Sequence, residues 1–181
     1  MNNQGNIVVA ALGAAVAGWA VWKLISKIGE KPKTENNTTM SNNANTSNQN
    51  LPLGYRNNNP LNIRYSSNNN WVGKVVPNTD GAFEQFVSLP YGYRAAIFLI
   101  KKYISQGLKT IPQIVSKWAP PSENHTNKYI DFVCKTTGLS AAQDITTPGQ
   151  IKDIVYAMAI FENGYTPLPN KNDIDLGYKL L

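Results

Sequence analysis

Residues 56–64 read Arg-Asn-Asn-Asn-Pro-Leu-Asn-Ile-Arg, and they are followed by Trp-Val-Gly at 71–73 and by Phe-Glu-Gln-Phe at 83–86. Side-chain amides offer paired hydrogen-bond donors and acceptors to hydroxyl and acetamido groups, while an indole offers a flat apolar face to a sugar ring. This combination predicts a site for a polysaccharide.

Composition narrows the classes of partner. The chain of 181 residues has 17 Lys and Arg against 11 Asp and Glu, a net charge of +6, and from residue 51 onward thirteen basic and nine acidic residues leave about +4. Such a charge favours polyanions, among them nucleic acid, anionic lipid and cell-wall material. The basic residues are scattered and do not alternate with aromatic ones, so we expect no nucleic-acid partner. With one cysteine and one histidine, we expect no disulfide, no metal site and no cofactor.

The N-terminal segment predicts a membrane anchor. Residues 7–22 carry no charge, and if the lysines that follow extend toward the interface, the apolar helix reaches residue 28, about 33 Å at about 1.5 Å per residue. We therefore predict a single-pass transmembrane anchor over residues 1–28 that contacts lipid through 7–28. A cleaved signal peptide is the alternative, although no Lys or Arg precedes the segment. All flanking positive charge follows it, which places the rest of the chain on the cytoplasmic side.

Residues 29–50 are polar and predict a disordered linker, so a single folded domain is expected at 51–181. We predict an α+β domain that is mainly helical. Residues 71–76 and 82–87, separated by a Pro-Asn-Thr-Asp-Gly turn, predict a short β-hairpin. Apolar spacing and helix-start signals predict helices at 90–105, 111–118, 126–137 and 147–162.

The motifs N-N-x-x-N-I, W-x-G, F-x-x-F and G-Y-R-A-A, from about residue 55 to about residue 164, resemble cell-wall hydrolases of the lysozyme superfamily. The likeness is to glucosaminidase-type and lytic-transglycosylase-type domains, and it is closest to virion proteins of membrane-containing phages that carry an R-N-N-N-P-x-N-I-R start. The resemblance implies a lysozyme-like fold and the glycan strand of peptidoglycan as partner.

In the families that this chain resembles, the catalytic acid is a Glu that ends an apolar helix just before the Asn-rich segment. Here the matching sequence, an apolar run ending in Glu162-Asn163-Gly164, lies at the other end of the domain. We therefore expect a circular permutation that brings Glu162 to the Asn-rich segment in space. A carboxylate at a helix C-terminus beside aromatic neighbours should have a raised pKa, as a general acid requires.

Further site residues follow from the resemblance. Tyr129 lies on a helix expected to line the cleft, where its phenol would face the glycan and hold the acetamido group or an intermediate. Asp80 and Glu84 are candidates for a second catalytic carboxylate. If neither reaches the cleft, Glu162 alone would serve as acid and base, as in a transglycosylase. The candidates for substrate binding are Asn59, Asn62, Trp71 and Tyr93.

These expectations describe a peptidoglycan glycosidase or lytic transglycosylase of a phage virion, located in the virion membrane and, during assembly, in the host inner membrane. Capsid or other virion membrane proteins are further expected partners. One alternative is a non-catalytic virion membrane protein that uses the same fold to bind the wall or to link membrane and capsid. Another is a host envelope hydrolase released by signal cleavage.

Overall fold

The computed structural model describes residues 50–121 and 125–181. The predicted anchor lies outside this part of the chain, and so does the predicted linker apart from Asn50. In the two described stretches no helix is both long and apolar enough to cross a membrane.

The described chain is mainly helical, in agreement with the sequence. Its helices, in chain order, are α2 (Leu53–Arg56), α3 (Leu89–Ser105), α4 (Ile111–Trp118), α5 (Thr126–Thr137), α6 (Pro148–Asn163) and α7 (Lys171–Lys179). Four of them, α3 to α6, lie within one residue of the predicted bounds at each end. The sequence predicts neither the single turn of α2 nor helix α7.

Local chemistry explains where these helices begin and end. At the start of α6, the Thr147 hydroxyl accepts a hydrogen bond from the Gln150 amide, and the Gln150 side chain accepts one from the Thr147 amide, with Pro148 in the first turn. This capping box satisfies amides that have no partner within the helix. Helix α5 ends at Gly138, whose φ of 72° is the left-handed conformation that glycine adopts most readily.

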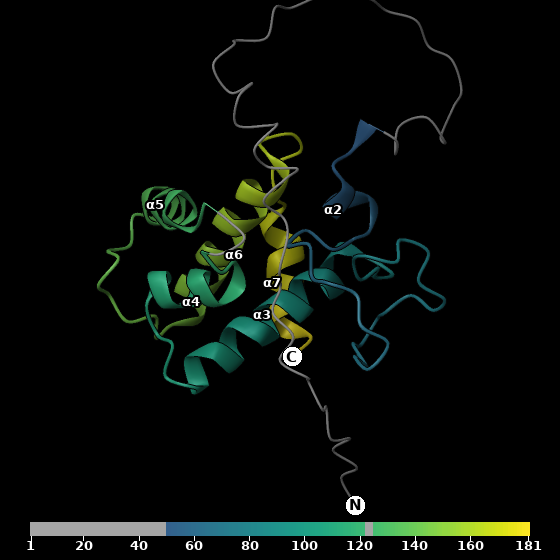
Figure 1. The fold of residues 1–181 in the computed structure, drawn as a ribbon, viewed down its shortest axis with the longest axis horizontal. Helices are drawn as coiled ribbons and strands as arrows, with labels where there is room; N and C mark the ends of the chain where they lie inside the picture. The colour runs from purple at the N-terminus through teal and green to yellow at the C-terminus, as the bar shows by residue number, and fades with distance from the viewer. Residues whose placement is uncertain (1–49, 122–124) are drawn as a thin grey trace, which may run out of the picture.

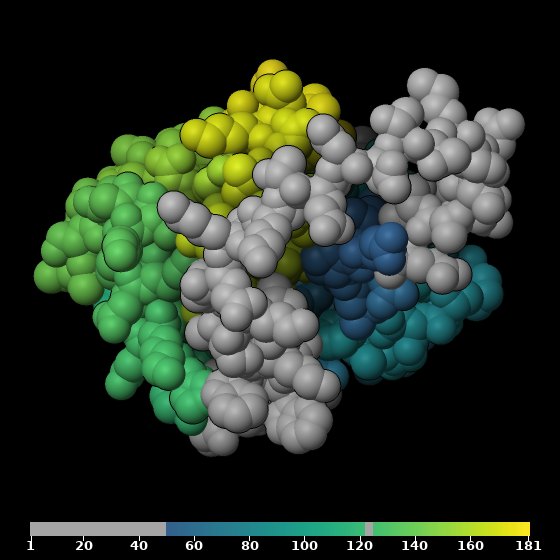
Figure 2. Space-filling view, turned by 90° about the horizontal axis from the view of Figure 1, so that it is seen from above, coloured from purple at the N-terminus to yellow at the C-terminus, as the bar shows by residue number. Residues whose placement is uncertain are grey.

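Helix α6 lies at the centre of the arrangement and packs against α5, α3, α7 and α2. In Figure 1, α4 and α5 lie on one side of α6, and the segment 57–88 lies on the other side. Figure 2 shows the same separation from above, with the green residues of α4 and α5 opposite the blue and teal residues of the Asn-rich segment. Helix α6 thus lies between α4 and α5 on one side and the segment 57–88 on the other.

Helix α7 packs closely against α3. Gly177 allows this contact, because a Cβ atom there would lie 2.8 Å from the carbonyl oxygen of Pro90 and 2.9 Å from the amide nitrogen of Arg94. On the same side of α7, Ile174 is buried in the main hydrophobic core. The core therefore extends from the segment after α2 to the last helix.

The predicted hairpin forms only in part. Lys74 pairs with Phe86 in an antiparallel bridge, and Arg64 pairs with Phe83 in another, but neither continues into a regular strand. The segment 82–87 divides its hydrogen bonds between two partners: the Glu84 amide donates to the Ile63 carbonyl, whereas the Val87 amide donates to the Gly73 carbonyl. Because the partner changes after one bridge, the pairing is too short for a strand on either side.

Candidate functional site

The end of α6 is fixed to the Asn-rich segment by Asn163. Its side-chain amide donates hydrogen bonds to the carbonyl oxygen of Pro60 at 2.6 Å and to that of Ala159 at 2.9 Å. The chain then leaves the helix at Gly164, which has a φ of 81°. These contacts orient the last turn of α6, and with it the side chain of Glu162.

The Glu162 carboxyl group joins three distant parts of the sequence. Its Oε2 accepts a hydrogen bond from the Asn62 Nδ2 at 3.1 Å, and its Oε1 accepts one from the Tyr129 hydroxyl at 3.0 Å. Asn62 precedes Glu162 by 100 residues and Tyr129 precedes it by 33. The structure therefore places Glu162 against the Asn-rich segment, which is the geometry expected from a permuted order.

Burial governs the protonation of this carboxyl group. Glu162 is 8% exposed. Burial raises its pKa from 4.5 to about 7, and the hydrogen bonds from Asn62 and Tyr129 oppose the shift because they favour the charged form. The pKa of Tyr129 is also raised, first by burial and then by the neighbouring Glu162 charge. Near neutral pH, Glu162 can therefore hold a proton and also release it.

The backbone around Asn62 is adapted to this contact. Asn62 has a φ of 51°, a left-handed conformation that Asn tolerates better than most residues. Gly54 of α2 approaches Asn62 and Asn163 so closely that a Cβ atom there would clash with the Asn163 side-chain oxygen. A small residue at 54 thus leaves room for both amides.

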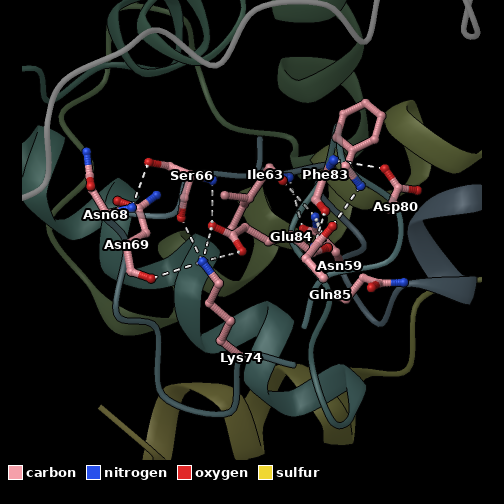
Figure 3. Close-up of polar contacts among 12 residues, drawn as sticks. Asn59, Ile63, Ser66, Asn68, Asn69, Lys74, Asp80, Phe83, Glu84 and Gln85 are labelled. Atoms are coloured by element: carbon pink, nitrogen blue, oxygen red, sulfur yellow. Dashed lines mark hydrogen bonds and ion pairs between the residues drawn. The ribbon is translucent and has the colours of Figure 1, made fainter. Parts of the chain in front are cut away.

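The other asparagines of the segment hold the loop together instead of facing a ligand. Asn59 is fully buried, and its side-chain amide donates to the carbonyl oxygens of Ile63 and Glu84 at 2.9 Å each. In Figure 3 it lies between these two stretches of chain. The prediction that Asn59 contacts substrate is therefore wrong, because its amide is used by the backbone.

Glu84, one candidate for the second carboxylate, is also structural. Its side chain is completely buried and pairs with Lys74 Nζ at 3.1 Å, while its Oε1 accepts a hydrogen bond from the Ser66 amide. Lys74 further donates to the carbonyl oxygens of Ser66 and Asn69, and Figure 3 shows these contacts converging on the ammonium group. The ion pair fixes the loop at 66–74, so the structure corrects the expectation that Glu84 reaches a substrate.

The other candidate, Asp80, stabilises a turn. Its Oδ1 accepts hydrogen bonds from the amides of Ala82 and Phe83, and its Oδ2 accepts one from the Asn57 side chain (Figure 3 shows the Phe83 contact). The turn interpretation, which the sequence supports nearly as well, accounts for these contacts. In the described part of the chain, Glu162 accepts its side-chain hydrogen bonds from Asn62 and Tyr129, and neither Asp80 nor Glu84 takes part in them.

Two aromatic residues expected to line a cleft lie in the core. Tyr93 is completely buried, and Trp71 is 7% exposed with its ring in an edge-to-face contact with Phe98. The hydrophobic face that suits a sugar also suits packing, and the structure uses both rings for packing, so neither presents an exposed face to a substrate. Tyr129 is likewise buried, so its hydroxyl contacts Glu162 and does not face a glycan directly.

Two features of the site were not predicted from the sequence: the role of Asn163 and the stacking of an aromatic residue beside the acid on Tyr129. Asn163 follows Glu162 directly, and its place in the Glu-Asn-Gly sequence was a signal that this amide could position the helix end. Phe161 stacks on Tyr129 with ring centroids 3.8 Å apart. The sequence places aromatic neighbours beside Glu162, but it does not indicate that one of them stacks on Tyr129.

Comparison with known proteins gives one informative relationship. No protein-family model matches the chain. It is 38% identical to protein P5 of Pseudoalteromonas phage PM2 over 120 residues, which cover 63% of this chain and 72% of P5. At this identity and coverage, the chain belongs to the family of phage PM2 protein P5.

Proposed function

We propose that this protein is a peptidoglycan-degrading glycosidase or lytic transglycosylase of a phage virion, in which Glu162 donates a proton to the glycosidic oxygen. The observation that carries the proposal is the environment of Glu162: a buried carboxyl group, with a pKa raised to about 7, held between Asn62 and Tyr129. Glycoside cleavage needs such an acid, because the leaving oxygen must be protonated near neutral pH.

The contacts of the remaining carboxylates favour lytic transglycosylase chemistry over hydrolysis. Asp80 caps a turn and Glu84 is paired with Lys74, so neither is available to activate water. In the proposed reaction Glu162 gives its proton to the glycosidic oxygen and the bond from that oxygen to the anomeric carbon breaks. The Glu162 carboxylate then takes the proton of the sugar's own primary hydroxyl, whose oxygen bonds to the anomeric carbon. The product has an anhydro end and no water is consumed.

Asn62 and Tyr129 have the role of positioning residues in this scheme. Each donates to a different oxygen of Glu162, which fixes the plane of the carboxyl group. Because both bonds favour the charged form, they limit how far burial raises the pKa. The acid can then regain the proton that it gives up.

For the fold, we propose a lysozyme-like domain with a circularly permuted order. The contact of Glu162 with Asn62 supports it, because the helix that supplies the acid comes last in the domain and the Asn-rich segment comes first. The resemblance of the motifs between about residues 55 and 164 supports the same assignment.

Membership in a family with a phage protein supports the proposed setting. We propose that residues 7–28 anchor the protein in the virion membrane and that residues 29–50 tether the domain, which opens the host wall during infection. The proposed partners are peptidoglycan glycan strands, the lipid membrane, and capsid or other virion membrane proteins.

Clearing of a suspension of purified peptidoglycan tests the enzymatic activity. We expect the full-length protein to clear it and Glu162→Gln to fail while remaining folded. Asp153→Asn is the matched control, because Asp153 is an exposed acid on the same helix and its change should leave clearing intact. Clearing by Glu162→Gln at the rate of the unmodified protein would place the acid elsewhere.

A non-catalytic virion protein that binds the wall or links membrane to capsid is the second candidate. It is favoured by the structural use of Asp80 and Glu84, since a domain that only binds needs no second carboxylate. The same assay separates the two candidates: a folded protein that sediments with peptidoglycan and never clears it would have the binding role.

A further inference from the structure

Four aromatic rings form a continuous series that starts at the candidate acid. The Tyr129 ring, whose hydroxyl contacts Glu162, stacks on Phe161. Phe161 contacts Phe132 at 5.4 Å between centroids, and Phe132 contacts Tyr165 at 6.4 Å in an edge-type arrangement. The series runs from a buried residue, Tyr129, to an exposed one, Tyr165.

Tyr165 has an unusual environment for an aromatic side chain of this protein. In the two described stretches only Tyr65 and Tyr165 are exposed aromatic residues, at 37% and 53%. The Tyr65 ring already has the Lys74 ammonium 4.7 Å from its centroid. Tyr165 is more exposed, and its contact with Phe132 does not cover it by stacking.

The chain also places Tyr165 close to the acid. Only Asn163 and Gly164 separate it from Glu162, and Gly164, with a φ of 81°, turns the chain so that the Tyr165 ring meets Phe132 of α5. Leu168, which is 54% exposed, follows in the same loop. The exposed apolar surface at this end of α6 is therefore next to the proposed site of bond cleavage.

We propose that Tyr165, supported by Phe132, is a platform on which a pyranose ring of the glycan strand stacks beside Glu162. This inference rests on the proposed function and names the part of the site that holds the sugar. Aromatic rings suit this task because their flat apolar faces match the C–H face of a pyranose, while the Tyr hydroxyl stays in water. In this proposal, Tyr165 makes the aromatic contact with the sugar that was expected from Trp71 and Tyr93, both of which are buried.

The local charge favours a glycan over an anionic lipid surface. The loop that carries Tyr165, residues 160–170, contains neither Lys nor Arg, and the exposed Lys128 and Lys135 that flank Phe132 on α5 are accompanied by the exposed Asp131. Membrane-surface segments, in contrast, usually carry an excess of basic residues around their apolar side chains. An uncharged sugar ring needs no such residues.

Binding to purified peptidoglycan tests the platform without any dependence on cleavage. The full-length protein with Glu162→Gln is sedimented with peptidoglycan and its dissociation constant is measured. Adding Tyr165→Leu should weaken binding roughly three- to tenfold, the range that one aromatic contact supplies, and Tyr165→Trp should retain it. Tyr178→Leu on α7 is the matched control and should change nothing.

A soluble tetramer of N-acetylglucosamine identifies the bound part of the wall. We expect it to compete with peptidoglycan for the Tyr165-containing protein and to compete less well for Tyr165→Leu. Unchanged binding by a folded Tyr165→Leu would overturn the proposal, and so would failure of the sugar to compete. If Tyr165→Leu weakens binding although the unmodified protein never clears peptidoglycan, the platform stands and the enzymatic function fails.

Discussion

Glu162→Gln should change how the stability of the protein depends on pH. In the unfolded chain the Glu162 pKa is near 4.5, and in the folded protein it is about 7. Below pH 4.5 the side chain is protonated in both states, so its ionisation contributes nothing. Between the two values the folded state binds more protons than the unfolded state, and the free energy of unfolding therefore falls as the pH rises.

The size of the effect follows from the shift. Each pKa unit corresponds to about 1.36 kcal/mol, so a change from 4.5 to about 7 makes this group destabilising by about 3 kcal/mol above pH 7. Gln has a similar shape and does not ionise. The stability of Glu162→Gln relative to the unmodified protein should therefore increase by about 3 kcal/mol between pH 4 and pH 8.

Urea denaturation of the full-length protein across this pH range measures the difference, with fluorescence of the buried Trp71 and Trp118 as the signal. A Glu162→Gln difference that does not change with pH would refute the reasoning, because it would mean that the folded environment does not disfavour the carboxylate.

Three further predictions test contacts that the structure shows. Tyr129→Phe removes a hydrogen bond that favours the charged form of Glu162, so the pKa of Glu162 should rise and the alkaline limb of the clearing rate should move to higher pH; an unchanged limb would contradict this. Gly54→Ala places a Cβ atom against Asn163 and Asn62, and we expect a loss of stability of about 1–3 kcal/mol in thermal unfolding. Gly138→Ala is the comparison: this residue has open space around it but a left-handed φ, and its substitution should cost about 1 kcal/mol. Lys74→Met leaves the buried Glu84 without its cation and should cost about 3–5 kcal/mol in urea denaturation; adding Glu84→Gln should recover part of that loss, and no recovery would mean that the ion pair is not what stabilises the loop.

The helices that the sequence predicts share a clear local signal. In α6, Thr147 and Pro148 mark the start and Gly164 marks the end, and the apolar residues between them belong to the core. Helix α7 begins with a cap, because the Asn170 side chain accepts a hydrogen bond from the Asn172 amide, but its nine residues include Gly177 and several charges, so its apolar pattern is weak. Its contact with α3 depends on the absence of a Cβ atom at Gly177, which only the three-dimensional arrangement reveals.

Residue type alone was a poor guide to which polar and aromatic side chains contact a ligand. Asn59 and Asn62 belong to the same motif, yet Asn59 bonds the backbone and Asn62 bonds the acid. Trp71 and Tyr93 are buried, whereas Tyr165, which the sequence did not single out as a binding residue, is exposed. The prediction that Glu162 meets the Asn-rich segment came from the order of motifs in the families that the chain resembles. The catalytic role of Glu162 stays a prediction.

The chemical identity of the products tests the central claim most directly. Purified peptidoglycan is digested with the full-length protein, and the ends of the released fragments are identified by mass spectrometry. Proton donation by Glu162 with no second carboxylate predicts anhydro ends from the unmodified protein and none from Glu162→Gln. Anhydro ends formed by Glu162→Gln at an undiminished rate would contradict the role of Glu162, and reducing ends from the unmodified protein would contradict the single-carboxylate reaction.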